Sequence, residues 1–295
     1  MPGPLAADMP VRQARGPRCL DVSAPDPDLM LRERLRVLYP GVSGRRLKQW
    51  LAGARVRVNG VVVHRGDSLV GPGDRVELGA PPPAPFPAAL GLVHEDEHLL
   101  VVDKPAALLT IATAAERRRT VYRLLSDWVR ARGGRRIFVV HRLDRETSGL
   151  LVFAKSFAVK RALQAQFEAR TPERVYVARV EGVVREEEGT LTSYLVENRA
   201  LRVRTARRGQ EAITRYRVLA RFRGATLLEL ALVTGRRGQI RAQLAALGHP
   251  IVGDREYGSR SNPLGRVCLH ATRLGFVHPS GRRVSFQSPP PAGFR

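Results

Sequence analysis

The chain has 295 residues, 43% of them hydrophobic, which is enough to bury a substantial core and to form about two domains of ordinary size. Its 50 Lys and Arg against 27 Asp and Glu give a net charge of +23, so we predict a polyanionic partner. The sequence contains only two cysteines, Cys19 and Cys268, so we predict a cytoplasmic protein without a disulfide framework or a metal site. It has no apolar stretch near the roughly 20 residues that span a bilayer, so we predict no membrane segment.

The first regular structure is predicted from residue 28 onward. Residues 1–27 are rich in Pro, Ala and Arg without a sustained period, so we expect a flexible basic arm there. The stretch LMLRERLRVLYPG (29–41) has apolar residues at helical spacing and ends at Pro-Gly. Ser43 can then cap a second helix, GRRLKQWLAG, whose polar side carries Arg45, Arg46 and Lys48.

A β-hairpin is predicted after the second helix. RVRVNGVVV (55–63) contains two alternating runs joined by Asn59-Gly60, and the turn PGD (72–74) leads to the strand RVEL. With SGRRL and VRVNG in the same order, residues 28–79 resemble the alpha-L RNA-binding domain shared with a ribosomal small-subunit protein. The resemblance implies that the basic helix contacts RNA. The alternative is a small α/β cap with a solvated basic face.

The dominance of arginine supports the same partner. Lys occurs only at positions 48, 104, 155 and 160, so guanidinium groups carry most of the positive charge. These groups bind phosphate through two parallel hydrogen bonds and stack on bases. A GC-rich genome would also replace Lys by Arg, but it would not create the net charge.

A second domain is predicted after a linker. APPPAPFPA (80–88) is proline-dense and should be an extended spacer, followed by a catalytic domain over 89–295. There we expect a buried strand at LLVV, helices near 121–132, 156–169 and 238–248, and several long strands. Long strands with few helices predict an α+β fold with a mixed or antiparallel central sheet, beside the small N-terminal α/β domain.

A polar loop, HRLDRETSG (141–149), interrupts two apolar runs and places Asp144 between two arginines. Such an acid is usually half of a surface ion pair, but loops on rigid apolar elements are where catalytic groups concentrate. A kinase catalytic loop would need contiguous His-Arg-Asp, and the sequence also lacks the P-loop, HExxH and serine-hydrolase patterns. We therefore interpret Ser148 as a turn residue, and the position of Asp144 in this loop leaves both a surface ion pair and a catalytic role open.

Five stretches, in order, resemble the RluA-type pseudouridine synthase family. They are EDEHLLVVDKP (95–105), HRLDRETSGLLVFAK (141–155), RVYVARVEG (174–182), TGRRGQIRAQLAALGHPIVGDREYG (234–258) and LHATRLGFVHP (269–279). This family isomerises uridine in RNA by detaching uracil from its ribose and rejoining it through carbon 5. The resemblance implies an isomerase that needs no cofactor and no metal.

The resemblance also assigns roles residue by residue. The family's catalytic aspartate falls on Asp144, which would either attack the anomeric carbon or remove a neighbouring proton from the sugar. The family's arginine falls on Arg241, which would pair with Asp144 and hold it charged and oriented in a pocket that excludes water. Tyr176 would stack on the target base, Arg142 would fill the space left by the flipped nucleotide, and His141 would orient the loop.

Two stretches depart from the family pattern. Members commonly read GRTHQIRVHL where this chain has GRRGQIRAQL, so that Gly238 and Gln243 replace two histidines. Ala107 stands where a glycine is usual. The Gln-Ile-Arg core is kept, so we expect the pairing of aspartate and arginine to survive. Arg237, beside Gly238, predicts an RNA contact altered toward phosphate binding.

Taken together, the sequence predicts a monomeric, cytoplasmic RNA pseudouridine synthase. Large-subunit ribosomal RNA is favoured as the substrate, because family members with this N-terminal domain tend to act on it, and transfer RNA is the alternative. RNA affinity should come mainly from phosphate contacts and weaken with salt. One rival is an inactive RNA-binding ribosome-assembly factor, which the altered motif favours. A base-removing hydrolase is the other, but no paired carboxylates are placed to activate water.

Overall fold

The computed structural model describes residues 28–80, 84–198 and 202–294. The predicted arm over residues 1–27 lies outside this description, as do residues 81–83 of the predicted linker. The chain divides into two compact units, Met1–Pro83 and Ala84–Arg295. None of the described helices is long and apolar enough to cross a membrane.

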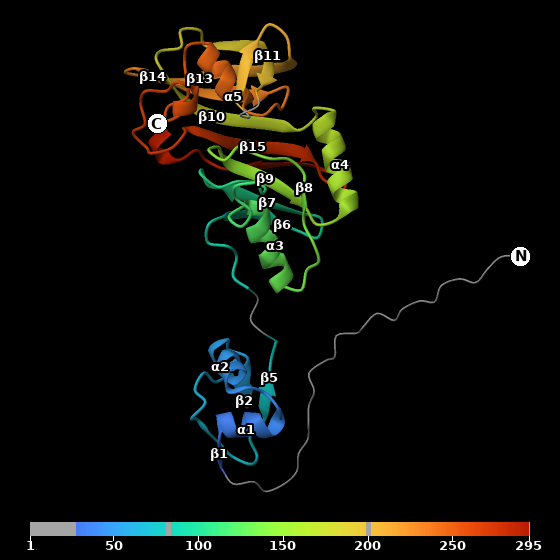
Figure 1. Cartoon of the computed structure of the whole chain (residues 1–295). Helices are drawn as coiled ribbons and strands as arrows, with labels where there is room; N and C mark the ends of the chain where they lie inside the picture. The colour runs from blue at the N-terminus through green and yellow to red at the C-terminus, as the bar shows by residue number, and fades with distance from the viewer. Residues whose placement is uncertain (1–27, 81–83, 199–201, 295) are drawn as a thin grey trace, which may run out of the picture. The chain divides into compact units, whose positions relative to one another are not determined.

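The small unit combines two helices with short strands (Figure 1). The helices are α1 (Leu31–Leu38) and α2 (Gly44–Ala52), and the strands are β1 (Leu29–Met30), β2 (Val56–Val58), β3 (Val61–Val62), β4 (Leu69–Val70) and β5 (Val76–Leu78). Strand β2 pairs antiparallel with β3 and β5, while β1 pairs with β4. One apolar cluster joins the inner faces of both helices to the strands, and it includes Leu35, Leu47 and Trp50.

Local sequence signals account for the turns of this unit. The Ser43 hydroxyl accepts a hydrogen bond from the Arg46 amide, 3.4 Å away, and so caps α2. Asn59 and Gly60 adopt positive φ angles of 51° and 81°, as the tight turn between β2 and β3 requires. The Asn59 side chain also donates to Asp74, 2.6 Å away, which ties the hairpin to the predicted PGD turn.

The large unit is built on an eleven-stranded sheet among its described residues (Figure 1). Its strands are β6 (Gly91–Glu95), β7 (Leu99–Lys104), β8 (Phe138–Val139), β9 (Ser148–Ala154), β10 (Glu173–Glu181), β11 (Glu188–Glu197), β12 (Val203–Ala206), β13 (Gln210–Phe222), β14 (Ala225–Leu232), β15 (Leu269–Val277) and β16 (Arg283–Gln287). The order is β12-β11-β13-β14-β10-β15-β9-β7-β6, with β16 on β15 and β8 on β9. Only the β9 and β15 pair is parallel among these strands, so the predicted α+β fold with a mixed sheet is confirmed.

Helices cover both faces of the β7 and β9 region. The helices of this unit are α3 (Val121–Ala131), α4 (Phe157–Glu168) and α5 (Gln239–Ala246), with short 3-10 turns at Arg255–Tyr257 and Ala292–Phe294. Alternate residues of β7 separate into two clusters, because strand side chains point to opposite faces. Leu100 packs with Leu125 of α3, whereas Leu99 packs with Leu163 of α4. This double burial explains the continuous apolar runs in the sequence.

Two details differ from the sequence predictions. The end of the predicted linker belongs to the large unit, because Phe86 packs edge-on against Trp128 and the Ala84 carbonyl accepts from the Trp128 indole, 3.0 Å away. The other detail is Phe157, an apolar residue of the helix predicted near 156–169, which is 58% exposed, while Val159 of the same helix is buried. The ring of Phe157 contacts Phe138 at the helix start, outside the core.

Candidate active site

The loop that carries Asp144 connects β8 to β9 and is held in place by buried hydrogen bonds to its backbone. The Thr110 hydroxyl donates to the Leu143 carbonyl at 2.8 Å and accepts from the Leu143 amide at 3.2 Å. The Thr147 amide donates to the Asp144 carbonyl, which closes a turn around the aspartate. The backbone of the loop is therefore held at both ends, and the Asp144 side chain projects from it.

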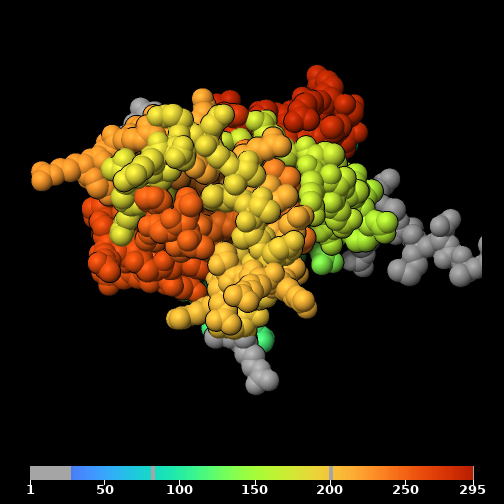
Figure 2. Space-filling view, turned by 90° about the horizontal axis from the view of Figure 1, so that it is seen from above, coloured from blue at the N-terminus to red at the C-terminus, as the bar shows by residue number. Residues whose placement is uncertain are grey.

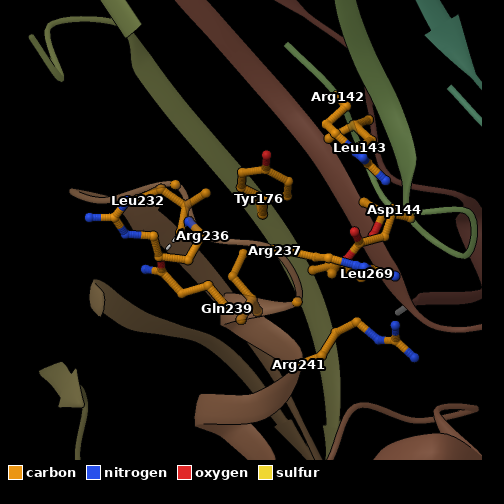
Figure 3. Close-up of a pocket in the computed structure, with 14 residues that line it drawn as sticks. Arg142, Leu143, Asp144, Tyr176, Leu232, Arg236, Arg237, Gln239, Arg241 and Leu269 are labelled. Carbon is orange, nitrogen blue, oxygen red and sulfur yellow. Dashed lines mark hydrogen bonds between the residues drawn. The ribbon is translucent and has the colours of Figure 1, made fainter. Parts of the chain in front are cut away.

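Five of the predicted site residues line one pocket of about 180 Å³ (Figure 3). They are Arg142, Asp144, Tyr176, Arg237 and Arg241. They come from three separate segments: the β8–β9 loop, strand β10, and the start of α5 with the loop before it. Residues almost 100 positions apart in sequence thus share one cavity. Within the described chain, the Asp144 side chain has no hydrogen bond or ion pair, so its oxygens are available to a ligand.

Arg241 does not form the predicted direct pair with Asp144. Its guanidinium donates twice to Asp254, at 2.6 and 2.7 Å, and once to Glu256 at 3.0 Å. It also lies over the ring of Tyr257, 4.6 Å from the centroid. Burial alone would lower the pKa of Arg241, but the Asp254 carboxylate raises it, with a smaller contribution from Asp144. The interaction with Asp144 is therefore attraction across the pocket.

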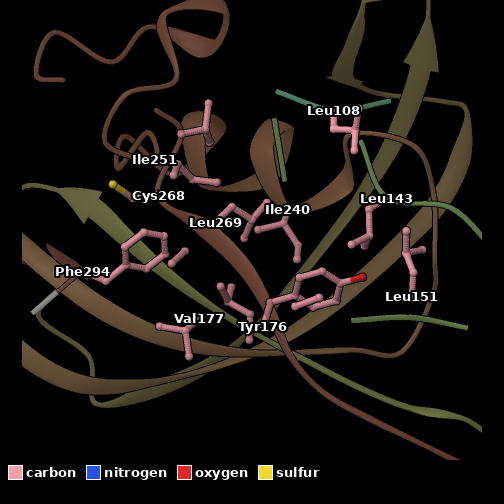
Figure 4. Packing of buried hydrophobic residues seen from close by; sticks show 14 of the residues in the cluster. Leu108, Leu143, Leu151, Tyr176, Val177, Ile240, Ile251, Cys268, Leu269 and Phe294 are labelled. Carbon is pink, nitrogen blue, oxygen red and sulfur yellow. The ribbon is translucent and has the colours of Figure 1, made fainter. Parts of the chain in front are cut away.

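Tyr176 lies on β10 with its ring in the wall of the pocket. The side chain is 9% exposed and packs with Leu143, Ile240 and Leu269 (Figure 4). Burial raises the pKa of Tyr176 to about 12, although the nearby charge of Arg174 acts against this shift. The phenol is thus protonated at neutral pH, and a flat ring is presented at the pocket surface beside Asp144.

Lys104 belongs to the support of this loop, and the sequence predictions did not single it out. The side chain is fully buried at the end of β7, and its ammonium donates to the carbonyls of Leu108 at 2.7 Å, Pro105 at 2.9 Å and Arg145 at 3.1 Å. Burial lowers the pKa of Lys104 to about 7, against the charges of Glu146 and Asp144. The sequence did contain a signal for this role, because a lysine at the end of an apolar strand places a charge in a buried position, where it needs hydrogen-bond partners.

His141 and Arg142 occupy different surroundings. The His141 ring stacks on Phe167 with 4.7 Å between centroids, and its Nε2 accepts from the Val152 amide at 3.3 Å. Burial, helped by the charge of Arg174, lowers the pKa of His141 to about 3, so the imidazole is neutral. Arg142 is exposed at the pocket rim and has no side-chain partner among the described residues. His141 thus faces the interior, while Arg142 faces solvent.

The predicted RNA contacts outside the loop lie at the surface. Arg237 lines the pocket but forms an ion pair with Glu197. Arg45, Arg46 and Lys48 are exposed on α2 of the small unit, where the first two line a shallow basic hollow together with Arg55. These positions are accessible to a polyanion.

Gly238 and Gln243, which stand where the family commonly has histidines, both have well-defined surroundings. Gly238 has a positive φ of 59°, and a side chain there would meet the Tyr257 hydroxyl, 2.9 Å from its Cβ position. Gln243 is buried and fully bonded: it accepts from the Thr214 hydroxyl at 2.6 Å and donates to the carbonyls of Ala212 at 2.9 Å and Leu191 at 3.0 Å. Gln243 therefore attaches α5 to β11 and β13, and the altered motif is internally satisfied.

Ser148 is not a turn residue, as the sequence suggested, but the buried first residue of β9. Its hydroxyl accepts from the Arg266 guanidinium at 2.6 Å and is hydrogen-bonded to Nδ1 of His270 at 2.8 Å. On its other side His270 contacts the Ser288 hydroxyl, which in turn donates to Asp103. This buried chain joins the end of the Asp144 loop to β15, and all its hydrogen bonds can be made with a neutral His270.

Comparisons with known proteins agree with this arrangement. The sequence profile of the RNA pseudouridylate synthase family matches residues 98–246. An RNA pseudouridine synthase of Bacillus subtilis (strain 168) is 35% identical over 260 residues, covering 84% of this chain and 86% of the relative. Ribosomal large subunit pseudouridine synthase D of Pseudomonas aeruginosa is 35% identical over 280 residues, covering 87% of each protein. The solved structure of human RNA pseudouridylate synthase domain containing 1 has a TM-score of 0.58 and 26% identity, over 68% of this chain and 84% of that one.

The chain therefore belongs to the RNA pseudouridylate synthase family, and within it to the RluA type. It is an isomerase that converts uridine in RNA into pseudouridine.

Proposed function

We propose that this enzyme isomerises uridine in large-subunit ribosomal RNA and that Asp144 acts on the ribose of the target nucleotide. The observation that carries the proposal is the unpaired Asp144 carboxylate in a pocket it shares with Tyr176 and Arg241. The substrate class is supported by the similarity to ribosomal large subunit pseudouridine synthase D, which extends over most of both chains. Transfer RNA is the alternative outcome of the test.

The chemistry follows from what each group can do in that pocket. The bond from uracil N1 to the anomeric carbon must break, and carbon 5 must bond to the same carbon while it loses its proton. A carboxylate with no local partner can approach the sugar. The positive charge of Arg241, and that of Lys104 in its protonated form, stabilise its negative charge from a distance. Tyr176 presents a flat ring on which the detached uracil can stack and turn.

Arg142 is assigned to the step in which the target nucleotide leaves the RNA stack. A uridine in a stem must leave the base stack before its glycosidic bond can enter the pocket, which costs a few kcal/mol. Arg142 is exposed at the rim, next in sequence to the buried Leu143, and has no described partner that would hold it back. Its guanidinium can therefore fill the space left in the RNA and stack on the neighbouring bases.

The test measures tritium released from RNA labelled at carbon 5 of uridine, with separate transcripts of large-subunit ribosomal, small-subunit ribosomal and transfer RNA. Wild-type protein should release tritium from the large-subunit transcript, and Asp144→Asn should lower the rate by roughly 10⁴-fold or more. Asp127→Asn, an exposed aspartate on α3, is the matched control and should keep the wild-type rate. Release from transfer RNA alone would overturn the substrate assignment, and unchanged release by Asp144→Asn would overturn the catalytic role. Salt-sensitive binding without release from any transcript or maturation intermediate would favour the assembly-factor reading.

A further inference from the structure

We propose that β12, the edge strand that pairs with β11, and the turn that leads from it to β13 bind the phosphodiester backbone of the RNA beside the active-site pocket; together they span residues 203–210. We call this stretch the arginine segment, because Arg204, Arg207 and Arg208 are its exposed cations. The inference rests on the proposed function only in taking RNA as the bound partner. It adds a contact surface that the catalytic motifs do not contain.

The arginine segment lies at one end of the central sheet. Strand β12 pairs with β11, from Tyr194 opposite Ala206 to Glu197 opposite Val203, and it is the last strand on that side. Val203 is buried in a small cluster with Ala242 of α5, so one face of the strand is fixed to the helix that carries Arg241. Arg204, the next residue, consequently points away from this cluster and is exposed.

The turn that leads from β12 to β13 packs closely against the backbone of β11. A side chain at Gly209 would lie 2.4 Å from the Leu195 carbonyl oxygen, so the turn approaches β11 as closely as a glycine allows. Arg207 and Arg208 directly precede this glycine and are exposed. A rigid turn presents its cations at low entropic cost, which favours binding to a fixed array of charges.

The local acids do not neutralise these three arginines. Glu197 pairs with Arg237, and Glu256 pairs with Arg202 and Arg241. Within the part of the chain that the structure describes, the side chains of Arg204, Arg207 and Arg208 make no ion pair and no hydrogen bond. Glu211, at the start of β13, is also exposed but forms no ion pair with them, so the three arginines give the segment an excess of positive charge.

The arginine segment is continuous with the active site. A hollow of about 330 Å³ is bounded by Val203, Gly209 and the neighbouring strands on one side and by Arg236 and Arg237 on the other. Arg236 and Arg237 also line the Asp144 pocket, so the two hollows share a wall. Figure 2 shows β11, β13 and α5, in yellow to orange, together on the face seen from above. An RNA strand that enters the Asp144 pocket would thus meet further cations in one direction.

The chemistry of the surface favours a phosphodiester over other partners. Guanidinium groups bind phosphate oxygens in a two-pronged geometry, and cations spaced along a strand and its turn suit an extended polyanion better than a single carboxylate. A bland alternative is that charges on an edge strand merely prevent pairing with other chains. Replacement by another charged residue separates the two readings, because glutamate would protect the edge equally well but would repel RNA.

The test compares the full-length variant Arg207→Glu/Arg208→Glu with the matched control Arg282→Glu/Arg283→Glu. The control pair is exposed, occupies the turn region between β15 and β16, and changes the net charge equally. Affinity for the large-subunit transcript is measured over a series of KCl concentrations. The arginine-segment variant should bind roughly 10- to 100-fold more weakly, with a salt slope reduced by about 0.7 to 0.9 for each lost phosphate contact. The control should stay within about twofold of wild type on this scale.

Two further measurements protect the interpretation. Arg207→Lys/Arg208→Lys should retain most of the salt slope, because the charges remain. In the Glu variant the loss should fall mainly on the KM for RNA and much less on kcat, since no residue that lines the Asp144 pocket is changed. Equal losses in the arginine-segment and control variants would overturn the proposal, as would wild-type binding by the arginine-segment variant. Failure of the isomerase assay on this RNA would count against the proposed substrate and would leave the binding comparison valid.

Discussion

Removal of the charge of Asp254 should destabilise the catalytic unit strongly. Asp254 is 1% exposed and holds Arg241, itself 8% exposed, through two short hydrogen bonds. Asp254→Asn keeps the shape but leaves a buried guanidinium with a weaker partner. Breaking such a pair from one side costs about 3 to 5 kcal/mol, and the remaining bond to Glu256 places the expected loss near the lower figure, about 3 kcal/mol.

Urea unfolding measures this loss. The fluorescence of Trp128 reports on the large unit alone if Trp50 of the small unit is replaced by Phe in all variants. With a urea dependence of up to about 3 kcal/mol per molar, a loss of about 3 kcal/mol moves the midpoint by about 1 M. The apolar double variant Arg241→Met/Asp254→Leu should recover most of the stability, because no buried charge is left unpaired and the half-exposed Glu256 keeps solvent and Arg202 as partners, but it should not release tritium.

Two results would refute the reasoning behind this prediction. If Asp254→Asn moved the midpoint by less than about 0.3 M, the buried pair would not carry the free energy that its burial implies. If the double variant were no more stable than the single one, the loss would come from the shape of the site and not from an uncompensated charge.

Three further changes test the surroundings of the site. Ala107 has a φ of 62°, a backbone conformation in which any side chain costs about 1 kcal/mol. Ala107→Gly should therefore raise the unfolding free energy by about 0.5 to 1 kcal/mol in the same urea assay. A decrease would contradict this prediction. Gln243→Leu leaves buried carbonyls without donors and should lower the unfolding free energy by about 2 to 4 kcal/mol. Gln243→His, which introduces the usual family residue, should lower it by less. Equal losses in the two variants would argue against the hydrogen-bond account. Because the pKa of His141 is lowered to about 3, the folded protein binds fewer protons than the unfolded chain below about pH 6.5, and stability falls as the pH drops through this range. His141→Gln, which does not titrate, should reduce that slope by up to about 1.4 kcal/mol per pH unit between about pH 5 and 6.5, and an unchanged slope would rule out His141 as the source.

Local chemistry explains which parts of the fold could be predicted. The cap at Ser43, the Asn59-Gly60 turn and the buried run of β7 each depend on neighbouring residues or on a period of two, and each could be predicted from sequence. The order of strands depends on contacts between distant segments, such as the parallel pairing of Ser148 with His270. No local pattern encodes such a pairing, so the sequence predicted the fold class and not the strand order.

The same limit applies to the site. The resemblance to the RluA type implied that Asp144, Tyr176 and Arg241 would come together, and all three line one pocket. The prediction that Arg241 pairs with Asp144 was wrong, since Asp254 and Glu256 were also available and the choice among three carboxylates depends on angstrom-scale geometry. Asp254 and Glu256 lie in the stretch GDREYG, only 13 and 15 residues after the arginine, and this proximity was the available signal.

The actual partners of Arg241 suit the chemistry better than the predicted pair would. In the proposed mechanism the oxygens of Asp144 reach the ribose. A guanidinium bound directly to Asp144 would occupy these oxygens, and the pair would have to break before the reaction. With its hydrogen bonds directed to Asp254, Arg241 still attracts the negative charge of Asp144 but leaves the carboxylate free. Fixed charges that need no rearrangement are the more effective kind in catalysis. The buried pair between Arg241 and Asp254 thus keeps a cation near the Asp144 carboxylate, the proposed catalytic group, without blocking it.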